Sequence, residues 1–273
     1  MKKLPITIQC TAIAGLIMAA GLSANAQTLA LQLKASNYNP LTGVWTDSSG
    51  NGNTATFANG TLPTLAAVTP NGSSAVDIIG ANASYGVGSH FGLLNPLSSA
   101  SGYTVFAYIE ATGSSSQRQA LTGGSLAGGG GNLEYDIYGG HQDFLREYLQ
   151  DVGSGTATVP TSSFSLVDLA VSSTLVGSFN FNGSADGTTS SGTAFGNPIT
   201  QIGNNEGGGD YFNGYIAEID IYQGVLNSTQ IATVEANLTA SYITPTPEPT
   251  TWAMMAGGFG MLLASRRFRR PQA

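Results

Sequence analysis

Short runs in which apolar residues alternate with smaller or polar ones dominate this chain, and clusters rich in Asn and Gly separate them. Leu29, Leu31 and Leu33 show the two-residue period of a half-buried β-strand. Turn clusters such as residues 49–53 and 71–73 supply Asn and Gly, which tolerate the positive φ of tight turns. The pattern predicts surface loops over the Gly-rich segments 123–131 and 183–192, and further strands over residues 75–79, 103–110, 133–138, 144–149, 164–172, 175–181 and 212–222.

A single helix is predicted after the last of these strands. Asn227 is a favourable N-cap, and an apolar face follows at helical spacing, formed by Ile231, Val234, Leu238 and Tyr242. Many strands followed by one late helix predict an all-β fold, an antiparallel β-sandwich that occupies residues 27–243.

The charge of this body excludes one class of partner. Residues 27–243 contain fifteen acidic residues and only three cations (Lys34, Arg118 and Arg146), a net charge of −12. Such a surface repels phosphate backbones, so we expect no nucleic-acid partner. An acidic surface suits solubility outside the cell or the binding of divalent cations. The only cysteine, Cys10, lies before the body, which therefore has neither disulfides nor a thiolate metal site.

The first 26 residues have the pattern of a secretory signal peptide. Lys2 and Lys3 form a basic start, and an apolar stretch covers residues 10–22. Ala24 and Ala26 then supply the small residues that signal peptidase requires, which predicts cleavage after Ala26.

The last thirty residues have the pattern of a membrane anchor. A Pro/Thr-rich linker (residues 244–250) contains the triplet Pro247-Glu248-Pro249, and residues 251–265 form an uncharged apolar stretch, predicted to be a transmembrane helix. The basic tail, residues 266–273, is predicted to be cytoplasmic and carries Arg266, Arg267, Arg269 and Arg270. At ~1.5 Å per residue the apolar stretch spans roughly 22 Å of a ~30 Å hydrocarbon core, so bilayer thinning and snorkelling arginines must supply the rest.

In this order, the Pro-Glu-Pro triplet, the apolar helix and the arginine cluster resemble a PEP-CTERM sorting signal. The resemblance implies that an exosortase recognises Pro247-Glu248-Pro249 and releases the protein from a transient anchor in the inner membrane. Proteins of this kind occur in Gram-negative bacteria that make extracellular polysaccharide, so the implied destination is the cell surface or extracellular matrix. The alternative is a plain single-span anchor that is never processed.

Two segments of the body resemble laminin-G-like, concanavalin A-like domains. The turn Trp45-Thr46-Asp47-Ser48-Ser49-Gly50-Asn51-Gly52-Asn53 is similar to an early turn of that family, and residues 212–222 with the helix over residues 231–242 look like its closing strand and tail helix. The resemblance implies a jelly-roll sandwich whose concave face or rim loops bind glycans or proteins, often with Ca²⁺.

Two strands carry acidic residues that bear on catalysis. Glu218, Asp220 and Tyr222 occupy the places of the Glu-x-Asp-x-Glu strand of laminarinase-type glucanases, with Tyr222 where the second Glu belongs. Retaining hydrolysis needs two carboxyls about 5–5.5 Å apart. The segment Glu134-Tyr135-Asp136-Ile137-Tyr138 departs from the motif in the same way. We therefore expect no catalytic residue here, and interpret both carboxylate pairs as outward positions of half-buried strands.

Metal-binding patterns are weak. Asp47, Ser49 and Asn51 copy the first half of an EF-hand loop, but Ala58 stands where that loop needs its bidentate Glu. A hairpin turn explains the segment, and the alternative is a Ca²⁺ ion held by Asp47 and Asn51 with a distant acid such as Asp210. The two histidines, His90 and His141, lack metal-ligand spacing; His141 with Asp143 could assist a metal, but a solvent-exposed loop histidine is the commoner case.

Aromatic residues supply the remaining candidates. Tyrosines that are either core residues or platforms for sugar rings are Tyr85, Tyr103, Tyr108, Tyr138 and Tyr211. Together these features predict a non-catalytic exported protein with a glycan-binding or adhesive role at the surface or in extracellular polysaccharide. The alternative is a divergent glycan hydrolase or lyase on the same fold.

Overall fold

A computed structural model of the chain describes residues 27–79, 88–113, 117–126, 130–146, 150–190, 198–205 and 209–243. The predicted signal peptide, linker, transmembrane helix and basic tail lie outside the described residues. Within the described residues, no helix is long and apolar enough to cross a membrane.

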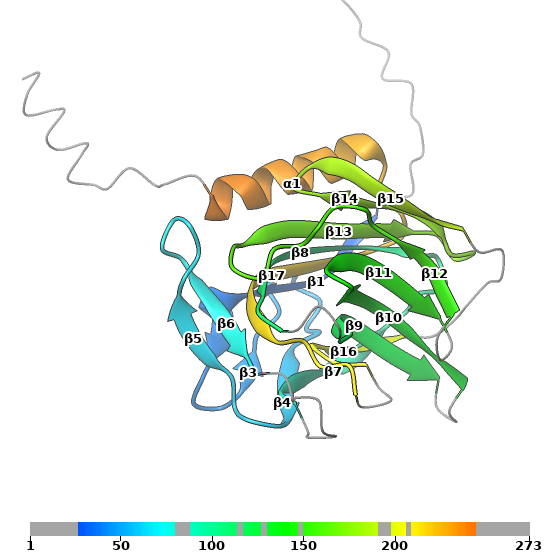
Figure 1. Ribbon diagram of the computed structural model, residues 1–273. Coiled ribbons are helices and arrows are strands. Elements are labelled where there is room, and N and C mark those ends of the chain that lie inside the picture. The colour runs from blue at the N-terminus through cyan, green and yellow to red at the C-terminus, as the bar shows by residue number, and fades with distance from the viewer. Residues whose placement is uncertain are drawn as a thin grey trace, which may run out of the picture.

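Two antiparallel sheets pack face to face (Figure 1). Sheet A has the order β15 (Ser184–Ser190), β14 (Val176–Phe181), β13 (Ser165–Val171), β8 (Tyr103–Ala111), β17 (Gly214–Gln223), β6 (Ser74–Ile78) and β5 (Thr64–Ala67), and β1 (Thr28–Lys34) also pairs with β17. Sheet B has the order β12 (Gln150–Ser154), β11 (His141–Arg146), β10 (Gly130–Tyr138), β9 (Gln119–Leu126), β16 (Ile199–Ile202), β7 (His90–Leu97), β4 (Ala55–Asn59), β3 (Val44–Trp45) and β2 (Tyr38–Asn39). The 3-10 turn η1 (Ala35–Asn37) links β1 to β2.

The main core lies between the sheets. Leu31 and Leu33 of β1 are fully buried in it, as their alternation predicts. Trp45 packs edge-on against Phe91 with ring centroids 5.2 Å apart, which ties β3 to β7. The all-β sandwich predicted from the strand period is confirmed.

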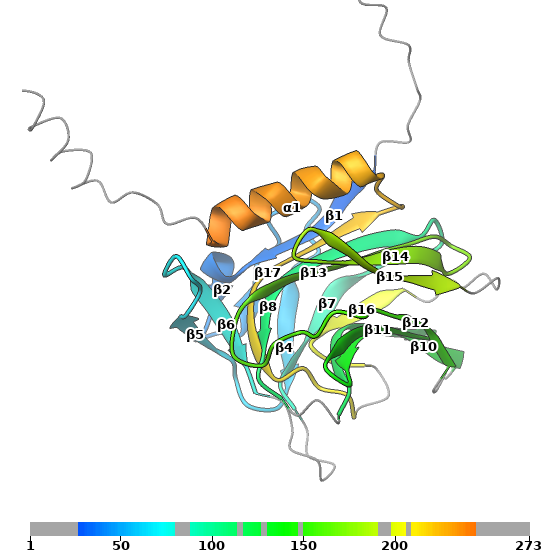
Figure 2. The same cartoon turned by 45° about the horizontal axis from the view of Figure 1, so that its top comes forward.

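Helix α1 (Ser228–Tyr242) lies across the outer face of sheet A in both views (Figures 1 and 2). It begins as predicted: the Asn227 side chain accepts a hydrogen bond from Gln230 N, and the Gln230 side chain accepts one from Asn227 N, which completes a capping box. Ile231, Leu238 and Tyr242 are buried against a second apolar cluster on this face, which includes Phe106, Tyr108 and Leu166.

The Gly-rich segments were wrongly predicted to be loops. Strand β9 extends to Leu126, β10 begins at Gly130, and β15 occupies residues 184–190. Glycine is required there by close backbone approach: a Cβ on Gly124 would collide with the Pro198 carbonyl, and one on Gly187 with the Ser154 carbonyl. Strand β11 also begins three residues before its predicted start, because Gly139 and Gly140, with φ of 62° and 80°, close a tight hairpin after β10.

Candidate functional site

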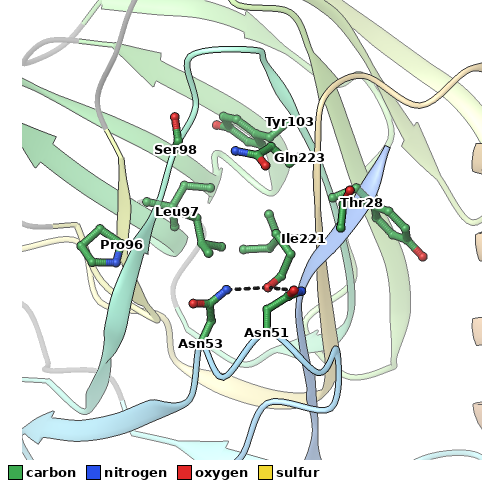
Figure 3. A pocket seen from close by; sticks show the side chains of 12 residues that line it. Thr28, Asn51, Asn53, Pro96, Leu97, Ser98, Tyr103, Ile221 and Gln223 are labelled. Atoms are coloured by element: carbon green, nitrogen blue, oxygen red, sulfur yellow. Dashed lines mark hydrogen bonds between the residues drawn. The ribbon is translucent and has the colours of Figure 1, made fainter. Parts of the chain in front are cut away.

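A cavity of about 300 Å³ opens at one end of the sandwich (Figure 3). At this end β1 and β8 begin, β7 and β17 end, and the turn after β3 closes one side. The lining residues from sheet A are Thr28, Ala30, Tyr103, Ile221, Tyr222 and Gln223; those from sheet B and its flank are Pro96, Leu97, Ser98 and Ile199; those from the turn are Asn51 and Asn53.

The lining combines an apolar surface with neutral polar groups. Leu97 and Ile221 belong to the core between the sheets and bring aliphatic surface into the cavity. Asn51 and Asn53 add amides, and Ser98 adds a hydroxyl. Among the described residues that line the cavity, none carries a carboxylate, an ammonium or a guanidinium group. Small-molecule sites typically have this composition, mostly apolar with a few placed hydrogen-bonding groups.

The turn over residues 47–53 forms one wall of the cavity, and its side chains cap the open edge of β1. Asn51 Nδ2 donates to the Leu29 carbonyl at 2.7 Å, and Asn53 Nδ2 donates to the Ala30 carbonyl at 2.7 Å. In Figure 3 the amide groups of Asn51 and Asn53 converge on the same carbonyl of β1. Side chains thus satisfy an edge strand that would otherwise present unpaired backbone groups.

Asp47 organises this turn. Its Oδ1 accepts hydrogen bonds from Gln32 N at 3.0 Å and Ser49 N at 2.8 Å, and its Oδ2 accepts from Ser49 Oγ at 2.8 Å and Asn53 N at 2.9 Å. Partial burial acts to raise the pKa of Asp47, but the backbone N–H donors outweigh it and hold that pKa below its usual value.

The two calcium candidates, Asp47 and Asn51, therefore lie in one turn, where N–H and O–H donors surround the carboxylate. Asp210, the distant acid considered with them, instead contacts Asn205 at 2.7 Å. Among the described residues, no group of three or more His, Cys, Asp or Glu side chains has an arrangement that could hold a metal ion.

A second polar cluster lies on the outer face of sheet B. Arg118 Nη1 contacts Asp136 Oδ2 at 3.0 Å and Asp143 Oδ2 at 2.8 Å. Its guanidinium carbon lies 4.3 Å from the ring centroid of Tyr138, which is 42% exposed. Asp143 thus pairs with Arg118, while His141 Nδ1 lies 2.9 Å from the Ala157 carbonyl.

Glu134 extends this cluster and is not the half-buried residue that the sequence predicted. Asn205 Nδ2 bridges Glu134 Oε2 at 3.3 Å and Asp210 Oδ2 at 2.7 Å. Burial, followed by the charges of Asp136 and Asp210, raises the pKa of Glu134 to about 9. Glu134 and Asp136 are both buried. The chain at residues 204–205 approaches Gly123, the partner of Glu134 on β9, whereas Asp136 contacts Arg118.

Glu218 and Asp220 also face away from the main core as predicted, but they are buried rather than half-buried. Helix α1 covers them: Tyr242 donates its hydroxyl to Glu218 Oε2 at 2.7 Å. On the other side, Gln32 Nε2 donates to Glu218 Oε1 at 2.9 Å, and Lys34 Nζ lies 3.7 Å from the same oxygen. A substrate would have to displace α1 to reach this carboxylate.

The remaining candidates are dispersed. Tyr103 and Tyr108 are buried core residues, although Tyr103 also reaches the cavity. His90 is buried with Nδ1 3.1 Å from the Gly88 carbonyl, and its ring lies 5.8 Å from that of Tyr211. Tyr85 lies outside the described residues.

Sequence reasoning missed most of the cavity. Its walls come from the ends of five strands, β1, β7, β8, β16 and β17, so no local motif marks Ser98 or Gln223. The available signals were the turn with Asn51 and Asn53, which resembles an early turn of concanavalin A-like domains, and Tyr103, a candidate platform for sugar rings that lines the cavity.

The sequence comparisons point to one family. A family model described as the concanavalin A-like lectin/glucanases superfamily matches residues 85–232, more than half of the chain. Comparison with curated protein sequences gives no significant match.

Solved structures share the fold at low sequence identity. Domain 4 of AbnA, an extracellular arabinanase from Geobacillus stearothermophilus solved in complex with arabinotriose, superposes with a TM-score of 0.58 at 17% identity, covering 77% of this chain and 98% of that one. The binding domain of Paraclostridial Mosquitocidal Protein 1 gives 0.55 at 13% identity, covering 77% and 52%. Trypanosoma rangeli sialidase, in complex with a difluorinated nononic acid, gives 0.53 at 19% identity, covering 81% and 34%. The chain thus spans nearly all of the arabinanase domain but only about half and a third of the other two chains.

Proposed function

Because the chain belongs to the concanavalin A-like lectin/glucanases superfamily, we propose that its body is a glycan-binding module that does not cleave its ligand. The observation that supports this most is the cavity at the open end of the sandwich, where fixed amides and a hydroxyl face aliphatic surface. Sugars present both C–H faces and hydroxyls, so this combination suits them. The arabinanase domain with the same fold was solved with arabinotriose, which makes that sugar a sensible first probe.

The test is direct binding to residues 27–243, a self-contained unit because all the described strands and the helix pair or pack within it. We expect arabinotriose or another oligosaccharide on a glycan array to bind with micromolar to millimolar affinity. Ser98→Trp should block the cavity mouth and abolish binding, because the Ser98 side chain is exposed there. Ser184→Trp should leave glycan binding intact, because Ser184 lies on β15, the edge strand of sheet A on the other side from β1. Absence of binding across the array would contradict the proposal, and equal binding by both variants would remove the cavity as the site.

The absence of catalysis is supported by where the carboxylates lie. Glu218 and Asp220 are covered by α1, and Glu134 is buried beside Asp210. The alternative, a divergent hydrolase or lyase, draws on one observation: a carboxyl with a raised pKa next to a second carboxyl is a pattern of acid/base catalysts. Glycan cleavage by the body that is lost in Glu134→Gln or Glu218→Gln would establish the enzyme.

We further propose that the body is exported and sorted by its two ends. Strand β1 begins at Thr28, two residues after the predicted cleavage site, and α1 ends at Tyr242, just before the Pro/Thr-rich linker. Signal peptidase would thus cut before the first strand of the sandwich, and exosortase after helix α1 in the sequence. Mass spectrometry of the surface fraction should find Gln27 at the N-terminus and a C-terminus before Ala273. Replacing Pro247, Glu248 and Pro249 with Ala should leave an anchored species in the inner membrane. An intact Met1 in a cytosolic protein would refute export.

A further inference from the structure

We propose that the cavity is selective for neutral sugars and excludes acidic ones such as uronic acids. This inference rests on the proposed glycan-binding function and specifies the ligand class. It follows from three features of the wall: the absence of charge, the orientation of two amides, and the amount of space.

The described residues of the wall offer no charged partner to an ionised ligand. None of the lining residues carries a carboxylate or a cation, and burial raises the pKa of the lining tyrosines, to about 12 for Tyr222 and well above its usual value for Tyr103. Both phenols are therefore neutral at physiological pH. A carboxylate that enters such a site loses water without gaining an ion pair, which is strongly unfavourable. The body around it, with a net charge of −12, adds long-range repulsion.

Two amides orient acceptor atoms toward a ligand. Because Asn51 Nδ2 and Asn53 Nδ2 donate to carbonyls of β1, the amide planes are held and each Oδ1 acceptor lies at the other corner of its amide group. Figure 3 shows the Asn53 oxygen on the side of the amide that faces Pro96, across the cavity from β1. Fixed acceptors of this kind favour a ligand with hydroxyl donors and disfavour a carboxylate, which has only acceptors.

The space suits a short sugar. A volume of about 300 Å³ is at the lower end of small-molecule sites, with room for about one or two sugar rings. Aliphatic surface from Leu97 and Ile221 can cover the C–H face of a ring while its hydroxyls reach the amides.

The experiment compares matched probes on the full chain, kept in a detergent without a sugar headgroup. Calorimetry would measure disaccharides of glucose, galactose, mannose, xylose and arabinose, and the uronic-acid counterparts of the first three. We expect at least one neutral sugar to bind, and its uronate to bind more than about ten-fold more weakly at pH 7. Ser98→Lys should reduce that difference by supplying a cation at the mouth, whereas Ser184→Lys, on strand β15 at the opposite edge of sheet A, should not.

The possible outcomes distinguish a failure of the selectivity for neutral sugars from a failure of glycan binding itself. Equal binding of a neutral sugar and its uronate, lost in Ser98→Trp, would overturn the selectivity and retain the glycan-binding function. Binding that Ser98→Trp does not affect would remove the cavity as the site and overturn the inference. No binding of any probe would overturn both.

Discussion

The Asp47 carboxylate accepts a hydrogen bond from the backbone N–H of Gln32 at 3.0 Å, which joins the turn over residues 47–53 to the open edge of β1. This contact gives Asp47 a structural role in the turn that the sequence also offered as a calcium site. The first strand of the body, the wall of the cavity and the conformation of the turn therefore depend on one partly buried set of hydrogen bonds.

Replacement of Asp47 by Asn should destabilise the body. The new amide N–H₂ would face N–H donors, so we expect the free energy of unfolding to fall by about 2–3 kcal/mol in urea denaturation. Asp77→Asn is the matched control, because burial raises the pKa of Asp77 and neutralisation there should change stability by less than about 0.5 kcal/mol. Equal effects of the two substitutions would contradict the structural role.

Calcium should not stabilise the protein if Asp47 and Asn51 act only as caps of β1. A site filled at a hundred times its Kd would add about 2.7 kcal/mol to stability. We expect millimolar Ca²⁺ to leave the thermal midpoint of residues 27–243 unchanged relative to EDTA. A Ca²⁺-dependent rise in Tm that is lost in Asn51→Ala would show that the turn binds the ion.

Strand glycines should tolerate a methyl group only where space exists. Gly124→Ala places a Cβ against the Pro198 carbonyl and should destabilise the body by about 1–3 kcal/mol or prevent folding. Gly92→Ala, on strand β7 of the same sheet, meets nothing within 4 Å and should be neutral or slightly stabilising. The difference between their denaturation midpoints checks the close approach of β9 to the segment before β16.

Stability should fall with rising pH because of Asp168, which lies on β13 beneath α1. Burial, followed by the charge of Glu235 on the helix, raises the pKa of Asp168 to about 8. A carboxyl whose folded-state pKa exceeds its unfolded value contributes most at low pH, and the contribution is lost between about pH 4 and pH 8. Asp168→Asn should flatten this dependence of stability on pH. At pH 9 the free energy of unfolding of the variant should exceed that of the wild type by on the order of 2–4 kcal/mol. An unchanged slope in urea titrations at several pH values would refute the assignment.

The docking of α1 should depend on its last residue. Tyr242→Phe removes the hydroxyl that donates to Glu218 Oε2, and leaves that buried oxygen without its partner, so stability should fall by about 1–3 kcal/mol. Tyr215→Phe serves as the control, because it removes a hydroxyl from a half-buried tyrosine on β17, the strand that carries Glu218. Urea denaturation of both variants distinguishes a specific hydrogen bond from the general loss of a polar group.

Local sequence patterns were sufficient to predict an element where the residues in the pattern favour only one kind of structure. The alternation of Leu29, Leu31 and Leu33 predicted a strand with one buried face, and Asn227 followed by an apolar face predicted α1. They failed at the Gly-rich segments, because glycine serves both turns and close backbone approach, and only the neighbouring strands distinguish the two.

The sequence by itself determined the fold class, because strand periods, turn residues and a helix cap depend on a few consecutive residues. The tertiary structure alone decided which polar residues are available for function. Glu218 and Asp220 were predicted correctly to face away from the core, yet α1, which follows later in the chain over Ser228–Tyr242, buries them. Conversely, Ser98, Gln223 and Asn53 have no common motif, and the pairing of distant strand ends brings them to one cavity. The physical reason is that burial depends on what the whole chain places over a residue, and alternation records only the side of the strand.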